Sequence, residues 1–110
     1  AFALQVISFC CDLPRKTELD VIRRQLIRSA TSVGANYRAA CRARSRREFL
    51  SKLSIVEEEA DESLYWLELL AELSRGKNDR LSALQKESSE LAAIVIASKK
   101  TARKGLAQTK

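Results

Sequence analysis

Signals that interrupt a helix occur at only three places in this chain, and this scarcity constrains its fold more than any other feature. Pro14 closes a first helical segment, the pair Ser45 and Glu48 forms a capping box that opens another, and Gly76 follows the next. Between these places apolar residues recur every three or four positions, and no segment shows the alternation of a strand. The sequence therefore predicts an all-α protein.

The predicted helices are amphipathic and are joined by short connections. They span residues 2–13, 18–43, 46–74 and 79–103. Because short connections favour antiparallel neighbours, we expect residues 1–110 to form a single antiparallel up-down-up-down four-helix bundle. A β-sandwich or barrel needs many more turn residues than the 3 glycines and 1 proline present.

The ends of the predicted helices carry weaker signals. Thr17 with Asp20 forms a second possible capping box at the start of the second helix. Asn78 or Asp79 is expected to cap the fourth helix, because both side chains can accept a hydrogen bond from the first turn. Gly76 is expected to cap the C-terminus of the third helix, and Gly105 is expected to end the fourth.

The absence of histidine excludes several classes of function. A chain with 0 histidines has no Ser–His or Cys–His pair and no histidine metal ligand. Its three cysteines, Cys10, Cys11 and Cys41, show no Cys-x-x-Cys spacing, so a zinc site or disulfide scaffold is poorly supported and a reducing cytoplasm is the default compartment. No apolar run approaches the ~18 residues of a membrane span. We therefore expect a cytoplasmic protein that is not an enzyme and needs no cofactor or membrane.

Basic residues gather on one side of the predicted second helix. At about 100° per residue, its outward arginines project within one sector, opposite the apolar stripe. The arginines of the following turn continue this sector, and the chain from Leu91 onward adds a second basic set without any acidic residue. Guanidinium groups suit phosphate, so these residues are candidates for binding RNA or DNA, although a solvated helix face is the simpler interpretation. The candidates are Arg24, Arg28, Arg38, Arg42, Arg44, Arg46 and Arg47, with Lys99, Lys100, Arg103 and Lys104 as the second set.

The predicted third helix is acidic. From Leu53 to Ser74 it carries seven carboxylates and no basic residue. Like charges four residues apart, such as Glu58 and Glu62, destabilise a helix unless cations face them. Arginines of a neighbouring helix could face them, and so could the arginines of another copy of the protein. A di-iron site would need inward carboxylates on several helices and a Glu-x-x-His motif, so we expect no metal.

The same helix carries a second apolar feature. Ile55, Tyr65, Trp66 and Leu69 lie off its main apolar stripe. Aromatic residues are enriched in protein interfaces, so these four residues are the predicted surface of self-association. In the alternative interpretation, Trp66 only flanks a broad core stripe.

Small residues surround Gly34 in the middle of the second helix. A glycine there costs roughly 1 kcal/mol relative to alanine, so we expect a close helix crossing at this position. Asn36 follows on the same helix, and the sequence does not decide between a buried and a surface position for it.

Three segments of the chain resemble one protein family. They are residues 29–36 (SATSVGAN), residues 44–49 (RSRREF) and residues 59–62 (EADE), the last followed by Trp66 and Leu67. In this order and at this spacing they resemble the bacterial four-helix-bundle proteins first noticed as products of intervening sequences in 23S ribosomal RNA genes. The resemblance implies a cytoplasmic, non-enzymatic homopentamer arranged around a central axis. A relative of that family, the accessory protein of diversity-generating retroelements, binds a reverse transcriptase and nucleic acid through a basic surface.

Together these observations predict a non-enzymatic homo-oligomer, expected to be a pentamer, that binds RNA or DNA through its basic surface without strong sequence preference. Phosphate neutralisation and counterion release, repeated around a ring, would supply the affinity. The alternative is an assembly or adaptor protein that binds a protein partner, with arginines that serve solubility or subunit contacts.

Overall fold

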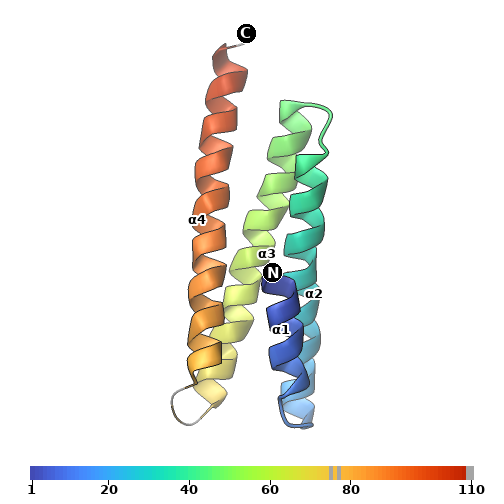
Figure 1. The fold of residues 1–110 in the computed structure, drawn as a ribbon, viewed down its shortest axis with the longest axis vertical. Coiled ribbons are helices and arrows are strands. Elements are labelled where there is room, and N and C mark those ends of the chain that lie inside the picture. The colour runs from blue at the N-terminus through green and yellow to red at the C-terminus, as the bar shows by residue number, and fades with distance from the viewer. Residues whose placement is uncertain (75, 77, 109–110) are drawn as a thin grey trace.

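The chain folds into four helices that run alternately in opposite directions (Figure 1). The computed structural model describes residues 1–74, 76 and 78–108. The helices are α1 (Phe2–Cys11), α2 (Thr17–Cys41), α3 (Arg46–Leu73) and α4 (Asp79–Gln108). No strand occurs in this described part of the chain, so the predicted all-α, up-down-up-down four-helix bundle is confirmed.

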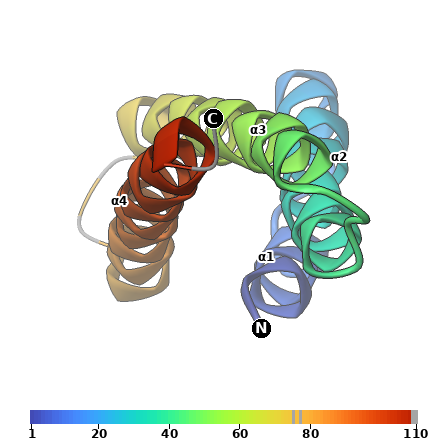
Figure 2. The ribbon, with the colours of Figure 1, turned by 90° about the horizontal axis from the view of Figure 1, so that it is seen from above.

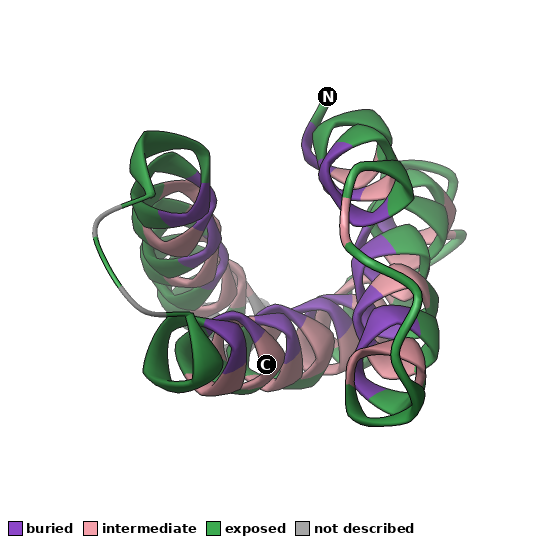
Figure 3. Cartoon of the chain, turned by 90° about the horizontal axis from the view of Figure 1, so that it is seen from below, coloured by how far each residue is buried: buried purple, intermediate pink, exposed green. Residues whose placement is uncertain are grey.

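Helix α3 lies between α2 and α4, and α1 lies beside α2 (Figure 2). The molecule is elongated, with principal extents of 54 × 21 × 19 Å. Helix α1 has 10 residues and is therefore only about 15 Å long, so it covers one half of the bundle. The buried residues line the inner sides of the helices, as Figure 3 shows, because the apolar stripes of all four helices point inward.

The core has two parts along this length. In the half that α1 covers, Phe2, Val6 and Phe9 pack with residues of the other three helices. In the other half, α2, α3 and α4 pack without α1, around residues such as Leu53 and Val56. Leu91 of α4 contacts both parts and joins them.

Buried serines lie where neighbouring helices contact each other. Ser29 of α2, Ser63 of α3 and Ser88 of α4 are each 0% exposed. Ser29 and Ser63 meet with their Oγ atoms 2.8 Å apart, and the Ser88 hydroxyl donates to the Ala60 carbonyl at 2.7 Å. The close approach predicted at Gly34 is wrong: this residue is exposed, and among the described residues no atom of another helix lies within 4 Å of where its Cβ would be. The small side chains at the serine positions, rather than the glycine, let the helices approach each other.

Two of the predicted caps are confirmed. The Ser45 side chain accepts a hydrogen bond from the Glu48 backbone N–H at 3.1 Å. Asn78 Oδ1 accepts from the Leu81 backbone N–H at 3.1 Å, so Asn78 caps α4. Asn36 is half-buried, and its Nδ2 donates within its own helix to the Ser32 carbonyl and hydroxyl oxygens at 3.0 Å each.

Three other expectations about helix ends are wrong. Thr17 does not cap α2: the N-cap is Lys16, no side chain caps that end, and the predicted partner Asp20 binds Arg23 instead. Gly76 has a φ of 104°, but α3 has already ended with Ser74 as its C-cap. Gly105 does not end α4, which continues to Gln108.

Arg23 is a buried residue whose role was not predicted. Its Nε donates to the Cys10 carbonyl at 3.0 Å, and its Nη2 donates to the carbonyls of Leu13 and Pro14 at 2.9 Å each. These acceptors lie at and beyond the end of α1, where helix carbonyls lack partners within the helix. Arg23 also pairs with Asp20. The arginine therefore fastens the α1–α2 connection onto α2.

Candidate nucleic-acid interface

The fold brings the later arginines of the first predicted basic set and the residues of the second set to the same end of the bundle. The α2–α3 connection and the start of α3 lie at this end, and the C-terminal part of α4 rises beside them (Figure 1). Arg46 and Phe49 of α3 line one groove together with Thr101 and Ala102 of α4. The Arg46 guanidinium also lies against Gly105, where a larger residue would collide with it. Residues about 55 positions apart in sequence, such as Arg46 and Thr101, thus form one surface.

We call this surface the basic end. It consists of residues that are all exposed, and each lacks a carboxylate within 4.0 Å among the described residues. Their charges are therefore available to a ligand. The residues are Arg44, Arg46, Arg47, Lys100, Arg103 and Lys104.

The position of Arg46 and Arg47 at the basic end does not favour the formation of α3. Arg46 and Arg47 occupy the first turn of α3, where the helix dipole places partial positive charge and makes cations unfavourable. The nearby carboxylate of Glu48 accepts a hydrogen bond from the Arg44 backbone N–H at 3.2 Å. This carboxylate therefore binds the backbone just before α3 and does not pair with the guanidinium groups. Stability of α3 does not explain why arginines stand here.

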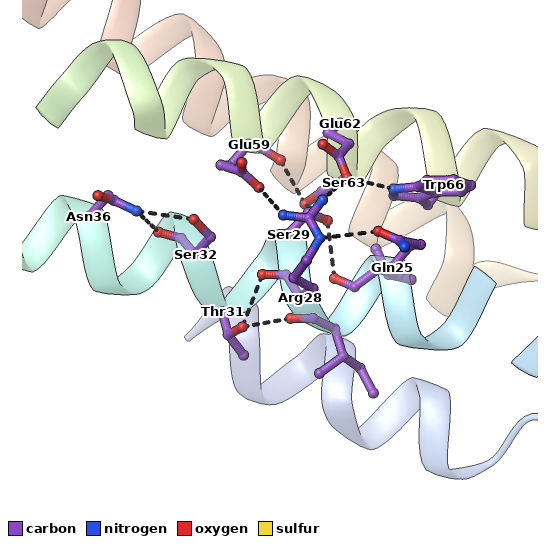
Figure 4. A network of polar contacts seen from close by, with 12 residues as sticks. Gln25, Arg28, Ser29, Thr31, Ser32, Asn36, Glu59, Glu62, Ser63 and Trp66 are labelled. Atoms are coloured by element: carbon purple, nitrogen blue, oxygen red, sulfur yellow. Dashed lines mark hydrogen bonds and ion pairs between the residues drawn. The ribbon is translucent and has the colours of Figure 1, made fainter. Parts of the chain in front are cut away.

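The arginines of α2 divide into two kinds. Arg28 reaches α3, where its Nη1 lies 3.1 Å from Glu59 and its Nη2 contacts Glu62 (Figure 4). Arg28 therefore neutralises acids of the neighbouring helix in its own subunit, which is one of the two arrangements that the sequence allowed. Arg24 and Arg42 are exposed and about 27 Å apart along the helix, so only Arg42 lies close to the basic end.

Arg38 is the remaining arginine of the α2 set, and it is exposed near the basic end. In the second set, Lys99 differs from its neighbours, because its side chain is only 12% exposed and its Nζ lies 2.9 Å from Glu57. Lys99 thus joins α4 to α3. Lys100, one residue further, is exposed.

The predicted self-association residues have different degrees of exposure. Trp66 and Leu69 are half-buried and pack against the core, and Trp66 Nε1 donates to Glu62 at 3.0 Å. Ile55 is also half-buried. Tyr65 is 54% exposed and meets the Trp66 ring edge-on, with ring centroids 4.9 Å apart. Tyr65 is therefore the member of this set that offers the most surface to a partner.

Metal and membrane sites do not emerge from the described residues. Within residues 1–74, 76 and 78–108, no three His, Cys, Asp or Glu side chains are placed to hold a metal ion. None of the helices described there is both long and apolar enough to cross a membrane.

The chain is similar to known proteins over most of its length. Residues 1–97 match the family described as 23S rRNA-intervening sequence protein. Among solved structures, a protein with unknown function from the S23 ribosomal protein family of Bacteroides thetaiotaomicron VPI-5482 is 34% identical. The match has a TM-score of 0.82 and covers 90% of this chain and 92% of that chain. No curated protein matches the chain.

Proposed function

The chain belongs to the 23S rRNA-intervening sequence protein family, and from this membership we propose that it is a cytoplasmic, non-enzymatic homo-oligomer that binds RNA or DNA. The proposed binding surface is the basic end, and the proposed assembly is a homopentamer. The family and the solved relative name no activity, so the proposal depends on the chemistry of this chain's own surface.

One observation carries the proposal: exposed cations from two segments far apart in sequence meet at one end, and none of them has a carboxylate within 4.0 Å among the described residues. Guanidinium groups bind phosphate bidentately and remain charged at every physiological pH. Binding through phosphates releases counterions and does not distinguish one base from another, so we expect little sequence preference. An assembly of several copies would repeat the basic end and strengthen binding to a long strand.

The test is fluorescence anisotropy with a labelled single-stranded RNA and the DNA of the same sequence, titrated over a range of salt concentrations. The double variant Arg46→Ala/Arg47→Ala removes two charges of the basic end. The matched control is Arg15→Ala/Lys16→Ala, which removes two adjacent exposed charges at the opposite end of the bundle. We expect the first variant to bind at least tenfold more weakly at low salt and to lower the salt slope by about 1.4, from about 0.7 per lost phosphate contact.

Two outcomes would contradict the proposal. Equal binding of the two double variants would mean that net charge, and not the basic end, attracts the strand. A wild-type protein that takes up neither RNA nor DNA at low salt would overturn nucleic-acid binding altogether. Light scattering on the same samples gives the mass of the assembly, and an oligomer that is indifferent to nucleic acid would favour the assembly or adaptor function.

A further inference from the structure

The outward face of α3 carries acids that have no partner in the subunit. Glu58, Asp61, Glu68 and Glu72 recur at helical spacing on this face, and Tyr65 lies midway between them. All five residues are exposed, and none of the four carboxylates has a cation within 4.0 Å among the described residues. Like charges three and four residues apart on a helix repel each other, so this face gains stability from an external cation.

The outward face of α2 has the complementary pattern. Arg24 and Arg38 are exposed and lack a carboxylate partner among the described residues, and Arg28 lies between them. Thr31 and Ala35 separate the arginines and are small, and the Thr31 hydroxyl donates to its own helix at the Ile27 carbonyl. This face therefore presents arginines with small side chains between them, and a large side chain of a partner can pack against these small side chains.

The two faces also match in height along the bundle. Ser29 and Ser63 touch, so they mark the same height on the antiparallel helices α2 and α3. Arg24 lies five residues from Ser29, and Glu68 lies five residues from Ser63 in the same direction in space, so both are displaced by about 7.5 Å. Arg24 and Glu68 are therefore level with each other.

At the other end of the two faces, the heights of Arg38 and Glu58 agree to within the reach of a side chain. Arg38 lies nine residues beyond Ser29, and Glu58 lies five residues before Ser63 in the same spatial direction. These heights differ by four residues, or about 6 Å, which an extended arginine side chain can span. Thr31 and Asp61 are level, because each lies two residues from the touching serines.

We propose that the partner of the α3 face is the α2 face of a second copy of this chain, packed antiparallel, with Arg24 near Glu68 and Arg38 near Glu58. Copies related by a rotation about an axis along the bundle keep every residue at its own height, so the register found within one subunit applies between subunits. The two faces belong to different helices, so the contact is head-to-tail and can close into a ring. Tyr65 packs against Arg28 and Thr31 at the centre. This inference rests on the self-association proposed above and specifies its surface.

The acidic face also shows why a second copy, and not nucleic acid, is the occupant. Four unpaired carboxylates repel a phosphate backbone, whereas arginine–carboxylate pairs across an interface set its register. Arg42 lies outside this contact, because Glu48, the acid nearest to its height, is off the acidic face of α3 and accepts a hydrogen bond from the Arg44 backbone.

The test is the mass of charge-reversed variants, measured by light scattering at one protein concentration and moderate salt. Arg24→Glu/Arg38→Glu removes the proposed cations, and Glu58→Arg/Glu68→Arg removes the proposed anions. We expect each to lose assembly, toward the 12.3 kDa of one chain, while far-UV circular dichroism still shows a helical protein. Combining all four changes in one chain reverses both proposed pairs, Arg24 with Glu68 and Arg38 with Glu58, and should restore the wild-type mass.

The matched control is Arg15→Glu/Arg42→Glu, which makes the same change in charge at exposed arginines outside the contact. It should keep the wild-type mass. A wild-type protein that is monomeric would overturn the proposed self-association together with this pairing. An oligomer that keeps its mass in Arg24→Glu/Arg38→Glu, or that is not restored by the fourfold reversal in a folded chain, would overturn the pairing alone.

Discussion

Replacing Arg23 tests the contact that joins α1 to the rest of the bundle. In Arg23→Met, a side chain of similar length keeps much of the apolar packing but donates no hydrogen bond. The carbonyls of Cys10, Leu13 and Pro14 then lose their donor. Cys10 is 0% exposed, so water cannot easily replace the arginine at its carbonyl.

The magnitude follows from how exposed each acceptor is. A buried acceptor left without a partner costs about 1–3 kcal/mol. Leu13 is half-buried and Pro14 is exposed, so water can satisfy their carbonyls at least in part. The pair with Asp20 adds little, because the Asp20 side chain is 37% exposed. We therefore expect Arg23→Met to lower the free energy of unfolding by about 2–3 kcal/mol, with the Cys10 carbonyl responsible for most of the loss.

Urea unfolding followed by far-UV circular dichroism measures this loss, at one fixed protein concentration because assembly also contributes to stability. The matched control is Arg15→Met, at an exposed arginine outside the proposed subunit contact, which should change the free energy of unfolding by no more than about 0.5 kcal/mol. If the two variants unfold at the same urea concentration with equal slopes, the hydrogen bonds of Arg23 do not hold α1, and the reasoning is refuted.

Two further changes test other parts of the fold. Gly34→Ala should raise the free energy of unfolding by about 1 kcal/mol, because the helical backbone has space for a Cβ there; a loss of stability or a change in assembly mass would show that another chain packs on this position. Burial raises the pKa of the Cys10 thiol from 9.0 to about 11, partly offset by Arg23. The unfolded chain therefore releases this proton first, so stability should fall between pH 9 and about 11, by up to about 1.4 kcal/mol per pH unit. Cys10→Ala should lack this part of the slope in urea unfolding at each pH, and equal slopes would contradict the assignment.

The helical class and two helix starts were predictable because their causes are local. Apolar residues every three or four positions define an inward stripe whatever the neighbours are. Ser45 and Asn78 act on backbone groups three residues away, so the sequence contains the whole interaction. Thr17 failed as a cap because it is already the first residue inside α2, where the Asp20 backbone N–H donates to the Lys16 carbonyl. Arg23 itself stands beside the buried Ile22, and a charged residue at the edge of an apolar stripe was the signal for its role.

The sequence by itself determined that the chain is helical, where most helices begin, and that its arginines and acids are segregated. Only the tertiary structure decided which charges are used within the subunit. Arg28 and Lys99 meet acids of α3, whereas Arg46 and Lys104 remain available at one end. The physical reason is that periodicity specifies which way a side chain points from its own helix, while pairing depends on the rotation and height of the neighbouring helix. Those two quantities are set by core packing between segments distant in sequence.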